Sequence, residues 1–261
     1  MNTVVVPIDF STPSLNAAAY AVKLLKGSYG TTLILYHMFE KKNDEEIANE
    51  QLTNLKNSLA KDCPLRIETI SIHGSDLVDE IERVVRHRSA NLVVMGITGK
   101  TGFEKVFIGS NTLKVIDKKA IPVLIVPPDA DFKKIKNVAL ASDFKDVKLA
   151  TPSAPIKFLL DLFHPSLHIV NVDSEHYVSI TSEYQKEQGV MNDMFGKYDP
   201  DYYFLGMNDF FEAIEKFIED KKIDVLITIP RQYSYLSKFL RERHTKKLAY
   251  HTHIPILAAH E

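Results

Sequence analysis

The sequence predicts an α/β fold of two tandem, doubly wound, five-stranded parallel sheets, each with the flavodoxin-like strand order 3-2-1-4-5. Short apolar runs alternate with amphipathic helical stretches, the pattern of the first half returns in the second, and a proline-containing break separates the two halves. Strands that alternate with helices indicate a parallel sheet covered on both faces. At 261 residues the chain is long enough for two such domains.

The first half contains five strand-like runs and four helical stretches. The expected strands are 4–8, 32–38, 65–72, 92–95 and 122–126. The expected helices are 13–26, 44–61, 75–88 and 111–119. We expect Ser75 to cap the third helix, and we expect Glu82 and Arg86 to share one face of it.

The second half repeats the first. Segments 4–10, 33–37, 92–94 and 120–124 are echoed by 138–144, 167–171, 225–227 and 253–257. The break lies at 127–131, so we predict one domain over 1–128 and a second over 134–261. The second domain has an additional polar, tyrosine-rich segment at 173–205, in which we expect a helix over 181–194.

Composition excludes several classes of protein. Lys and Arg number 32 against 34 Asp and Glu, so charge gives no reason to expect nucleic acid as a partner. No apolar run approaches the roughly 20 residues of a membrane span, and no signal-like segment opens the chain. The single cysteine, Cys63, excludes an internal disulfide. We therefore expect a cytoplasmic protein that binds neither nucleic acid nor membrane.

A glycine pattern after the fourth strand carries the strongest chemical signal. Gly96 and Gly99 follow the strand, and Gly109 and Ser110 open the next helix. Glycines permit close backbone approach, and the amide groups of such turns, together with a helix N-terminus, suit an anion. The alternative is a loop whose glycines only permit a tight turn.

The position of Asp9 supports a ligand site. In the predicted strand order, the first and fourth strands are neighbours, and ligands bind at their carboxyl ends, where the winding switches direction. Asp9 follows strand one and Gly96 follows strand four. The carboxylate can accept hydrogen bonds from ribose hydroxyls or an adenine amine, and His37 and Met38 would form a wall for a base.

This glycine spacing resembles the motif of nucleotide-binding universal stress proteins. The resemblance extends to segments 7–11 and 121–126 and covers nearly the whole chain as two tandem copies. It implies ATP or another adenine nucleotide, with or without Mg²⁺, bound to a five-stranded α/β domain. It also implies association through the last strands, which would pair the two halves within one chain and would permit a homodimer.

The resemblance assigns roles to individual residues. Asp9 would contact ribose or base, Pro7, Ile8 and Met38 would lie near adenine, and the glycine loop would hold the phosphates. Lys100 would either screen phosphate charge or remain solvated. The complete predicted set is Pro7, Ile8, Asp9, Met38, Met95, Gly96, Thr98, Gly99, Lys100, Gly109, Ser110, Asn111 and Thr112.

The second half departs from the motif. The positions of Gly96, Gly99, Gly109 and Ser110 are occupied there by Ile229, Gln232, Glu242 and Arg243. We therefore predict one nucleotide site per chain, with the second half as a built-in partner. No metal site is expected from the histidines near the C-terminus, and no catalytic residues are predicted. The alternatives are a slow ATPase or nucleotidyl transferase, or a small-ligand module in the second half.

Overall fold

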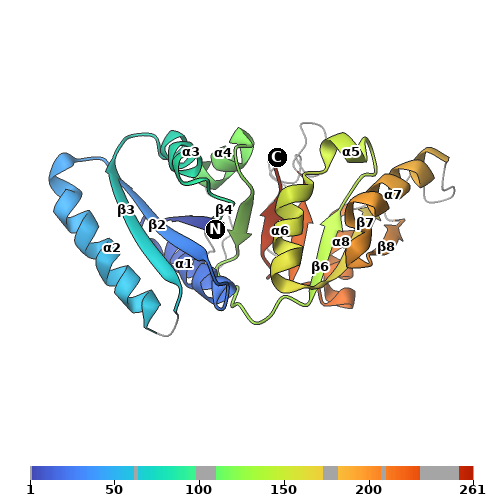
Figure 1. Ribbon diagram of the computed structural model, residues 1–261, viewed down its shortest axis with the longest axis horizontal. Coiled ribbons are helices and arrows are strands. Elements are labelled where there is room, and N and C mark those ends of the chain that lie inside the picture. Colours follow the sequence, from blue (N-terminus) through green and yellow to red (C-terminus); the bar gives the residue numbers. More distant parts are fainter. Residues whose placement is uncertain are drawn as a thin grey trace. The chain divides into compact units, whose positions relative to one another are not determined.

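The chain divides into two compact units, Met1–Phe132 and Lys133–Glu261, drawn in Figure 1. The computed structural model describes residues 2–61, 64–97, 110–172, 182–206, 210–229 and 253–260, with only the backbone at 110, 172, 210 and 211. Each unit is considered by itself below.

The N-terminal unit contains one parallel sheet. Its strands are β1 (Asn2–Pro7), β2 (Thr31–Phe39), β3 (Arg66–His73), β4 (Leu92–Gly96) and β5 (Val123–Val126), in the order β3-β2-β1-β4-β5. The register pairs Val4 of β1 with Leu33 of β2 on one side and with Leu92 of β4 on the other. The expected fold class and strand order are confirmed.

The helices of this unit are α1 (Thr12–Leu25), the short 3₁₀ turn η1 (Lys42–Asp44), α2 (Glu45–Ala60), α3 (Leu77–Arg88) and α4 (Ser110–Lys118). Ser11 is the N-cap of α1, because its side chain accepts a hydrogen bond from the Ser14 amide. Pro13 lies in the first turn, where proline favours the start of a helix. With helices between its strands, the sheet is buried, and Val4, Val5 and Val6 have no exposed surface.

The prediction that Ser75 caps α3 is wrong. Asp76 is the cap: its backbone is extended, and its carboxylate accepts hydrogen bonds from the amides of Val78 at 2.9 Å and Asp79 at 3.2 Å. These two bonds hold the pKa of Asp76 below its ordinary value. Serine and aspartate are both good N-cap residues. The longer side chain of Asp76 reaches two unpaired amides, and its negative charge lies at the positive end of the helix dipole.

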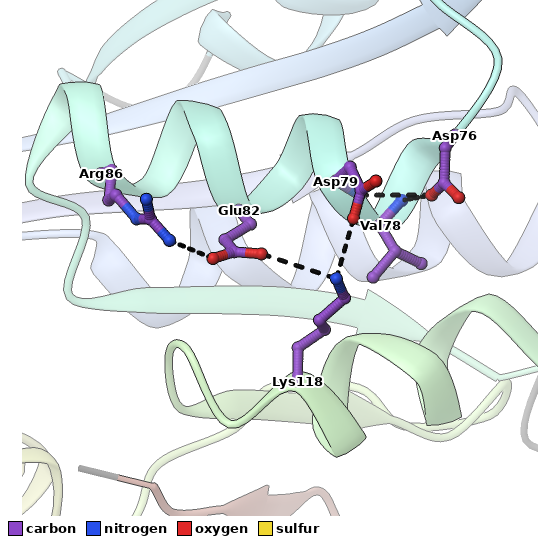
Figure 2. Close-up of polar contacts among 6 residues, drawn as sticks. All are labelled: Asp76, Val78, Asp79, Glu82, Arg86 and Lys118. Atoms are coloured by element: carbon purple, nitrogen blue, oxygen red, sulfur yellow. Dashed lines mark hydrogen bonds and ion pairs between the residues drawn. The ribbon is translucent and has the colours of Figure 1, made fainter.

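A chain of ion pairs links α3 to α4 (Figure 2). The Lys118 ammonium lies 2.8 Å from Asp79 Oδ1 and 3.7 Å from Glu82 Oε2. Glu82 also pairs with Arg86 one turn later, so their expected shared face is confirmed. Because these groups lie at the surface, where water screens charge, the pairs orient α4 against α3 more than they stabilise the fold.

The C-terminal unit repeats the strand order of the first. Its strands are β6 (Asn137–Ala141), β7 (Ser166–Val172), β8 (Asp201–Leu205), β9 (Val225–Thr228) and β10 (Ile256–Ala258). They lie in the order β10-β9-β6-β7-β8, and the four pairings are parallel. The helices are α5 (Val147–Ala150), α6 (Ser153–Phe163), α7 (Ser182–Phe195) and α8 (Phe210–Lys221), with a 3₁₀ turn, η2 (Gly196–Tyr198), after α7.

The helix after the first strand differs between the units. In the N-terminal unit, α1 is continuous, whereas its counterpart is divided into α5 and α6 at Thr151 and Pro152. Proline disfavours helical backbone in the preceding residue, and Thr151 is extended, with φ −102° and ψ 108°. No helix among the described residues is long and apolar enough to cross a membrane.

A matched pair of substitutions on α2 tests the packing of the N-terminal unit. Leu52 is completely buried, whereas the side chain of Ile47 on the same helix is 56% exposed. We expect Leu52→Ala to lower the free energy of unfolding by about 2–5 kcal/mol, because it leaves a cavity. Ile47→Ala should change it by less than about 0.5 kcal/mol. Equal effects in urea unfolding would contradict the packing of α2.

Candidate functional site

Asp9 and Gly96 lie at the same edge of the N-terminal sheet. Gly96 ends β4, Asp9 follows β1 by two residues, and the two strands are parallel neighbours, with Val5 paired to Val93. The carboxyl ends of neighbouring parallel strands meet at one edge. The predicted switch point is therefore present between β1 and β4, because β2 and β3 continue the sheet on one side of it and β5 continues it on the other.

The Asp9 carboxylate is fixed by the start of α1. Its Oδ1 accepts hydrogen bonds from the Ser11 amide at 3.0 Å and from the Ser11 hydroxyl at 2.5 Å. The Ser14 hydroxyl, in turn, donates to the Ser11 carbonyl oxygen at 3.0 Å and accepts a bond of 3.4 Å from the Asp9 amide. These bonds hold Asp9 in one orientation although the residue is exposed to solvent.

The same bonds favour the ionised form of Asp9. Partial burial raises the pKa of this carboxyl, and the hydrogen bonds from Ser11 and Ser14 lower it by more, so the pKa lies below its ordinary value. Asp9 is therefore ionised at neutral pH. It presents a fixed, solvent-accessible hydrogen-bond acceptor at the carboxyl edge of the sheet.

Gly96 is required by packing. A Cβ atom at this position would lie 2.1 Å from the carbonyl oxygen of Pro13 and 2.6 Å from its carbonyl carbon. Both are backbone atoms in the first turn of α1, so neither can yield as a flexible side chain would. The structure thus gives Gly96 a packing role, whereas its predicted contact with phosphate stays a prediction.

A second contact joins the ends of β1 and β2. The Ile8 amide donates to the Tyr36 carbonyl at 2.7 Å, and Nδ1 of His37 lies 2.6 Å from the Ile8 carbonyl, to which it donates. The half-buried ring of Phe10 packs on His37 with centroids 4.8 Å apart. Phe10 has a φ of 60°, an unusual value for a residue with a side chain. Sequence reasoning did not identify Phe10, because no residue type marks this backbone conformation.

Met38 lies on the face of β2 opposite to His37, near Glu80 of α3, so the prediction that the two side chains form one wall for a base is wrong. A Cβ added to Gly74 would lie 3.1 Å from Met38 Sδ and 3.3 Å from Cγ of Glu80, so the glycine leaves room for both side chains. Glu80 also accepts a hydrogen bond of 3.4 Å from the Tyr36 hydroxyl. Pro7 and Ile8, the other residues predicted to lie near adenine, are buried, and so is Met95 of the predicted nucleotide-binding set.

The predicted phosphate loop is described only at its ends. Thr98, Gly99, Lys100 and Gly109 lie outside the described residues, and Ser110 is described only as the first backbone position of α4. Asn111 is exposed at the start of α4. Thr112, in contrast, is only 3% exposed.

The C-terminal unit repeats the hydrogen bonds between the ends of its first two strands, but it lacks the glycine. The Ser142 amide donates to the Val170 carbonyl at 3.0 Å, and the Asn171 side-chain amide donates to the Ser142 carbonyl at 3.0 Å. These bonds correspond to those of Ile8 and His37. Phe144 repeats the positive φ of Phe10, at 51°. At the end of β9, however, a buried Ile229 occupies the position of Gly96.

The histidines form no metal site within the described parts of the chain, where no group of three or more His, Cys, Asp or Glu side chains could hold a metal ion. His253 is exposed and His260 is buried. His244 and His251 lie outside the described residues.

Comparison with known proteins gives the family. The profile of the universal stress protein family matches residues 1–127. The universal stress protein MJ0531 of Methanocaldococcus jannaschii is 30% identical in an alignment of 139 residues that covers 47% of this chain and 80% of that protein. The chain belongs to the universal stress protein family. A second universal stress protein of the same organism, MJ0577, is 28% identical in an alignment of 152 residues that covers 46% of this chain and 91% of that protein.

A solved structure agrees with the fold of the whole chain. A universal stress protein from Archaeoglobus fulgidus superposes with a TM-score of 0.68 and 17% identity, covering 99% of this chain and 98% of that one. At this identity the likeness shows the fold alone. The expected membership of the universal stress protein family is confirmed.

The close contact at Gly96 can be tested by adding a methyl group. We expect Gly96→Ala to lower the free energy of unfolding by about 1–3 kcal/mol, because the backbone of β4 or α1 must shift. Gly74→Ala is the matched control, since the atoms that it meets belong to side chains that can move. An equal loss for both variants in urea unfolding would show that the Pro13 contact is not the constraint.

The state of Asp9 can be tested by titration. We expect its carboxyl carbon to titrate by NMR below the ordinary pKa of 3.8, and Ser11→Ala to raise that pKa. Because the folded-state pKa is lowered, Asp9 contributes stability that is present above the pKa of the unfolded chain and is lost as pH falls through the folded value. A folded pKa at or above 3.8 would contradict the geometry.

Proposed function

We propose that the N-terminal unit binds ATP or another adenine nucleotide, and that the protein uses the bound nucleotide as a signal in a stress response. The proposal is carried by one observation: a fixed, ionised and exposed Asp9 stands beside Gly96 at the switch point of the sheet. In a doubly wound sheet this is the position at which ligands bind.

The chemistry of the surrounding residues fits a nucleoside. An ionised carboxylate accepts hydrogen bonds from the two hydroxyls of a ribose, and Asp9 is held for this by Ser11. The Met38 side chain offers a soft apolar surface, which suits a planar base. The loop from Gly96 to the start of α4 would bring glycine amides and a helix N-terminus to the phosphates.

Nucleotide storage or sensing fits the described residues better than rapid turnover. Apart from Asp9, no carboxylate is described at the carboxyl ends of β1 and β4 that could act as a partner in general acid–base chemistry. Any Mg²⁺ would come with the nucleotide and would need few protein ligands. Slow hydrolysis or nucleotidyl transfer remains the second candidate function, because an ionised Asp9 could position a water molecule.

The proposal specifies one site per chain, in the N-terminal unit. A phosphate loop needs close backbone approach, and the C-terminal unit has Ile229 where β4 ends in Gly96. Glu242, at the position of Gly109, would add negative charge beside a polyphosphate. This half would therefore lack ATP even though Asp143 is present.

Calorimetry on the full chain tests the proposal. We expect ATP, ADP or AMP to bind with a stoichiometry of one per chain, and Gly109→Val to abolish binding, because a branched side chain blocks the approach of phosphate to the loop backbone. Gly189→Ala is the matched control: Gly189 lies in α7, nothing lies within 4 Å of its Cβ position, and binding should be unchanged.

Asp9→Ala separates the two candidate functions. For a signalling protein, this variant should weaken binding without affecting phosphate release, which should be negligible in both proteins. Steady multiple-turnover release by the native chain, lost in Asp9→Ala, would favour an ATPase. No binding of ATP, ADP or AMP by the native chain would rule out the nucleotide site.

A further inference from the structure

The helix between the second and third strands packs differently in the two units (Figure 1). In the N-terminal unit, α2 packs against β2 and β3. Its counterpart α7 instead packs against α5, and Lys157 of α6 lies 5.9 Å from the centre of the Phe195 ring at its far end. α7 therefore lies against the segment that follows β6.

The first turn of α7 inserts a ring between aromatic side chains. Tyr184 meets Phe144 with centroids 4.6 Å apart and meets the edge of Phe204 at 4.8 Å. Tyr202 lies 6.3 Å from Phe144 and completes what we call the aromatic cage, formed by Phe144, Tyr202 and Phe204. Burial raises the pKa of both tyrosines. Within the described parts of the chain, the buried hydroxyl of Tyr202 has no hydrogen-bond partner.

Glu187 holds the same helix at a second point. Its carboxylate accepts a hydrogen bond of 2.8 Å from the amide of Val147, the first residue of α5. Tyr184 and Glu187 are three residues apart and share one face of α7. A carboxylate bound to an amide makes a stronger hydrogen bond than a neutral acceptor. The ring and the carboxylate thus fix α7 over the residues that follow Asp143.

Among the described residues of the N-terminal unit, the same positions have no such cover. Phe10, which corresponds to Phe144, is half-buried and packs on His37. The strand registers place Ser71 where β8 has Phe204, since His37 pairs with Ser71 and Asn171 with Phe204. The Ser71 hydroxyl donates to Asn49 of α2 at 2.7 Å, which holds α2 against β3.

We propose that α7 is a built-in lid of the C-terminal unit, and that the aromatic cage is a receptor for a phenol-like ring. Tyr184 occupies the cage from within the chain, and Glu187 latches the lid to Val147. A planar aromatic ligand with a hydrogen-bond acceptor, which the Tyr202 hydroxyl could serve, can enter only when the first turns of α7 detach. This inference does not depend on nucleotide binding by the N-terminal unit.

Amide exchange in the full chain tests the latch. Glu187→Ala should accelerate exchange of the Val147 amide about tenfold, because its acceptor is lost. Glu187→Gln, which keeps an uncharged acceptor, should give a smaller increase. Glu183→Ala is the matched control, because Glu183 is an exposed carboxylate one turn earlier in α7. An unchanged rate in Glu187→Ala would overturn the latch.

The receptor is tested with p-cresol, which reproduces the side chain of tyrosine. Tyr184→Ala should open a ring-sized apolar space, and such engineered spaces take up small aromatic molecules. We expect this variant to bind p-cresol at one site per chain, with a rise in Tm, and we expect the native chain and Tyr184→Phe to bind it much more weakly, because their internal ring must first leave the cage.

Two outcomes would overturn the receptor. One is a Tyr184→Ala variant that does not bind p-cresol, and the other is a native chain that binds it equally well. If Tyr184→Ala does not fold, Tyr184→Leu supplies the second variant. With part of the space left empty, it should bind p-cresol more weakly than Tyr184→Ala would but more tightly than the native chain, and no binding would again overturn the receptor.

Discussion

The close approach of β4 to the first turn of α1 is the constraint on which the candidate site depends. Only hydrogen fits between Gly96 and the Pro13 carbonyl group. The same turn contains Ser11, which both caps α1 and orients the Asp9 carboxylate. One packing contact therefore places the start of the glycine loop, the N-terminus of α1 and the acidic side chain at one edge of the sheet.

This constraint determines which substitutions can report on function. Because Gly96 is needed for the contact with α1, a variant there would change the fold and the site together. The predicted binding role falls instead on Gly99 and Gly109, for which glycine spacing is the argument. The Thr112 hydroxyl is also restricted, since Thr112 is only 3% exposed, and Asn111 is its accessible neighbour in the first turn of α4.

Local patterns predicted the sheets and the position of Asp9, because a buried parallel strand is a short apolar run and its carboxyl end follows directly. They could not choose between Ser75 and Asp76 as a cap, since the two neighbours have similar preferences and the choice depends on backbone angles. The helix expected over 181–194 is observed as Ser182–Phe195, but its packing was not predictable. Its inner face includes Tyr184 and Glu187, whose partners are distant in sequence.

The two units show how one strand order can support different uses of its carboxyl edge. In both, a phenylalanine with positive φ follows the first strand, and a side chain of the second strand donates to that segment. The divergence begins with the connecting helix. Where Ser71 binds Asn49, α2 stays on the sheet and Asp9 remains accessible. Where Phe204 replaces that serine, a ring is buried most favourably against other rings, and Tyr184 brings α7 to it. A polar-to-aromatic change on the third strand thus favours a helix that covers the segment after the first strand over one that stays on the sheet.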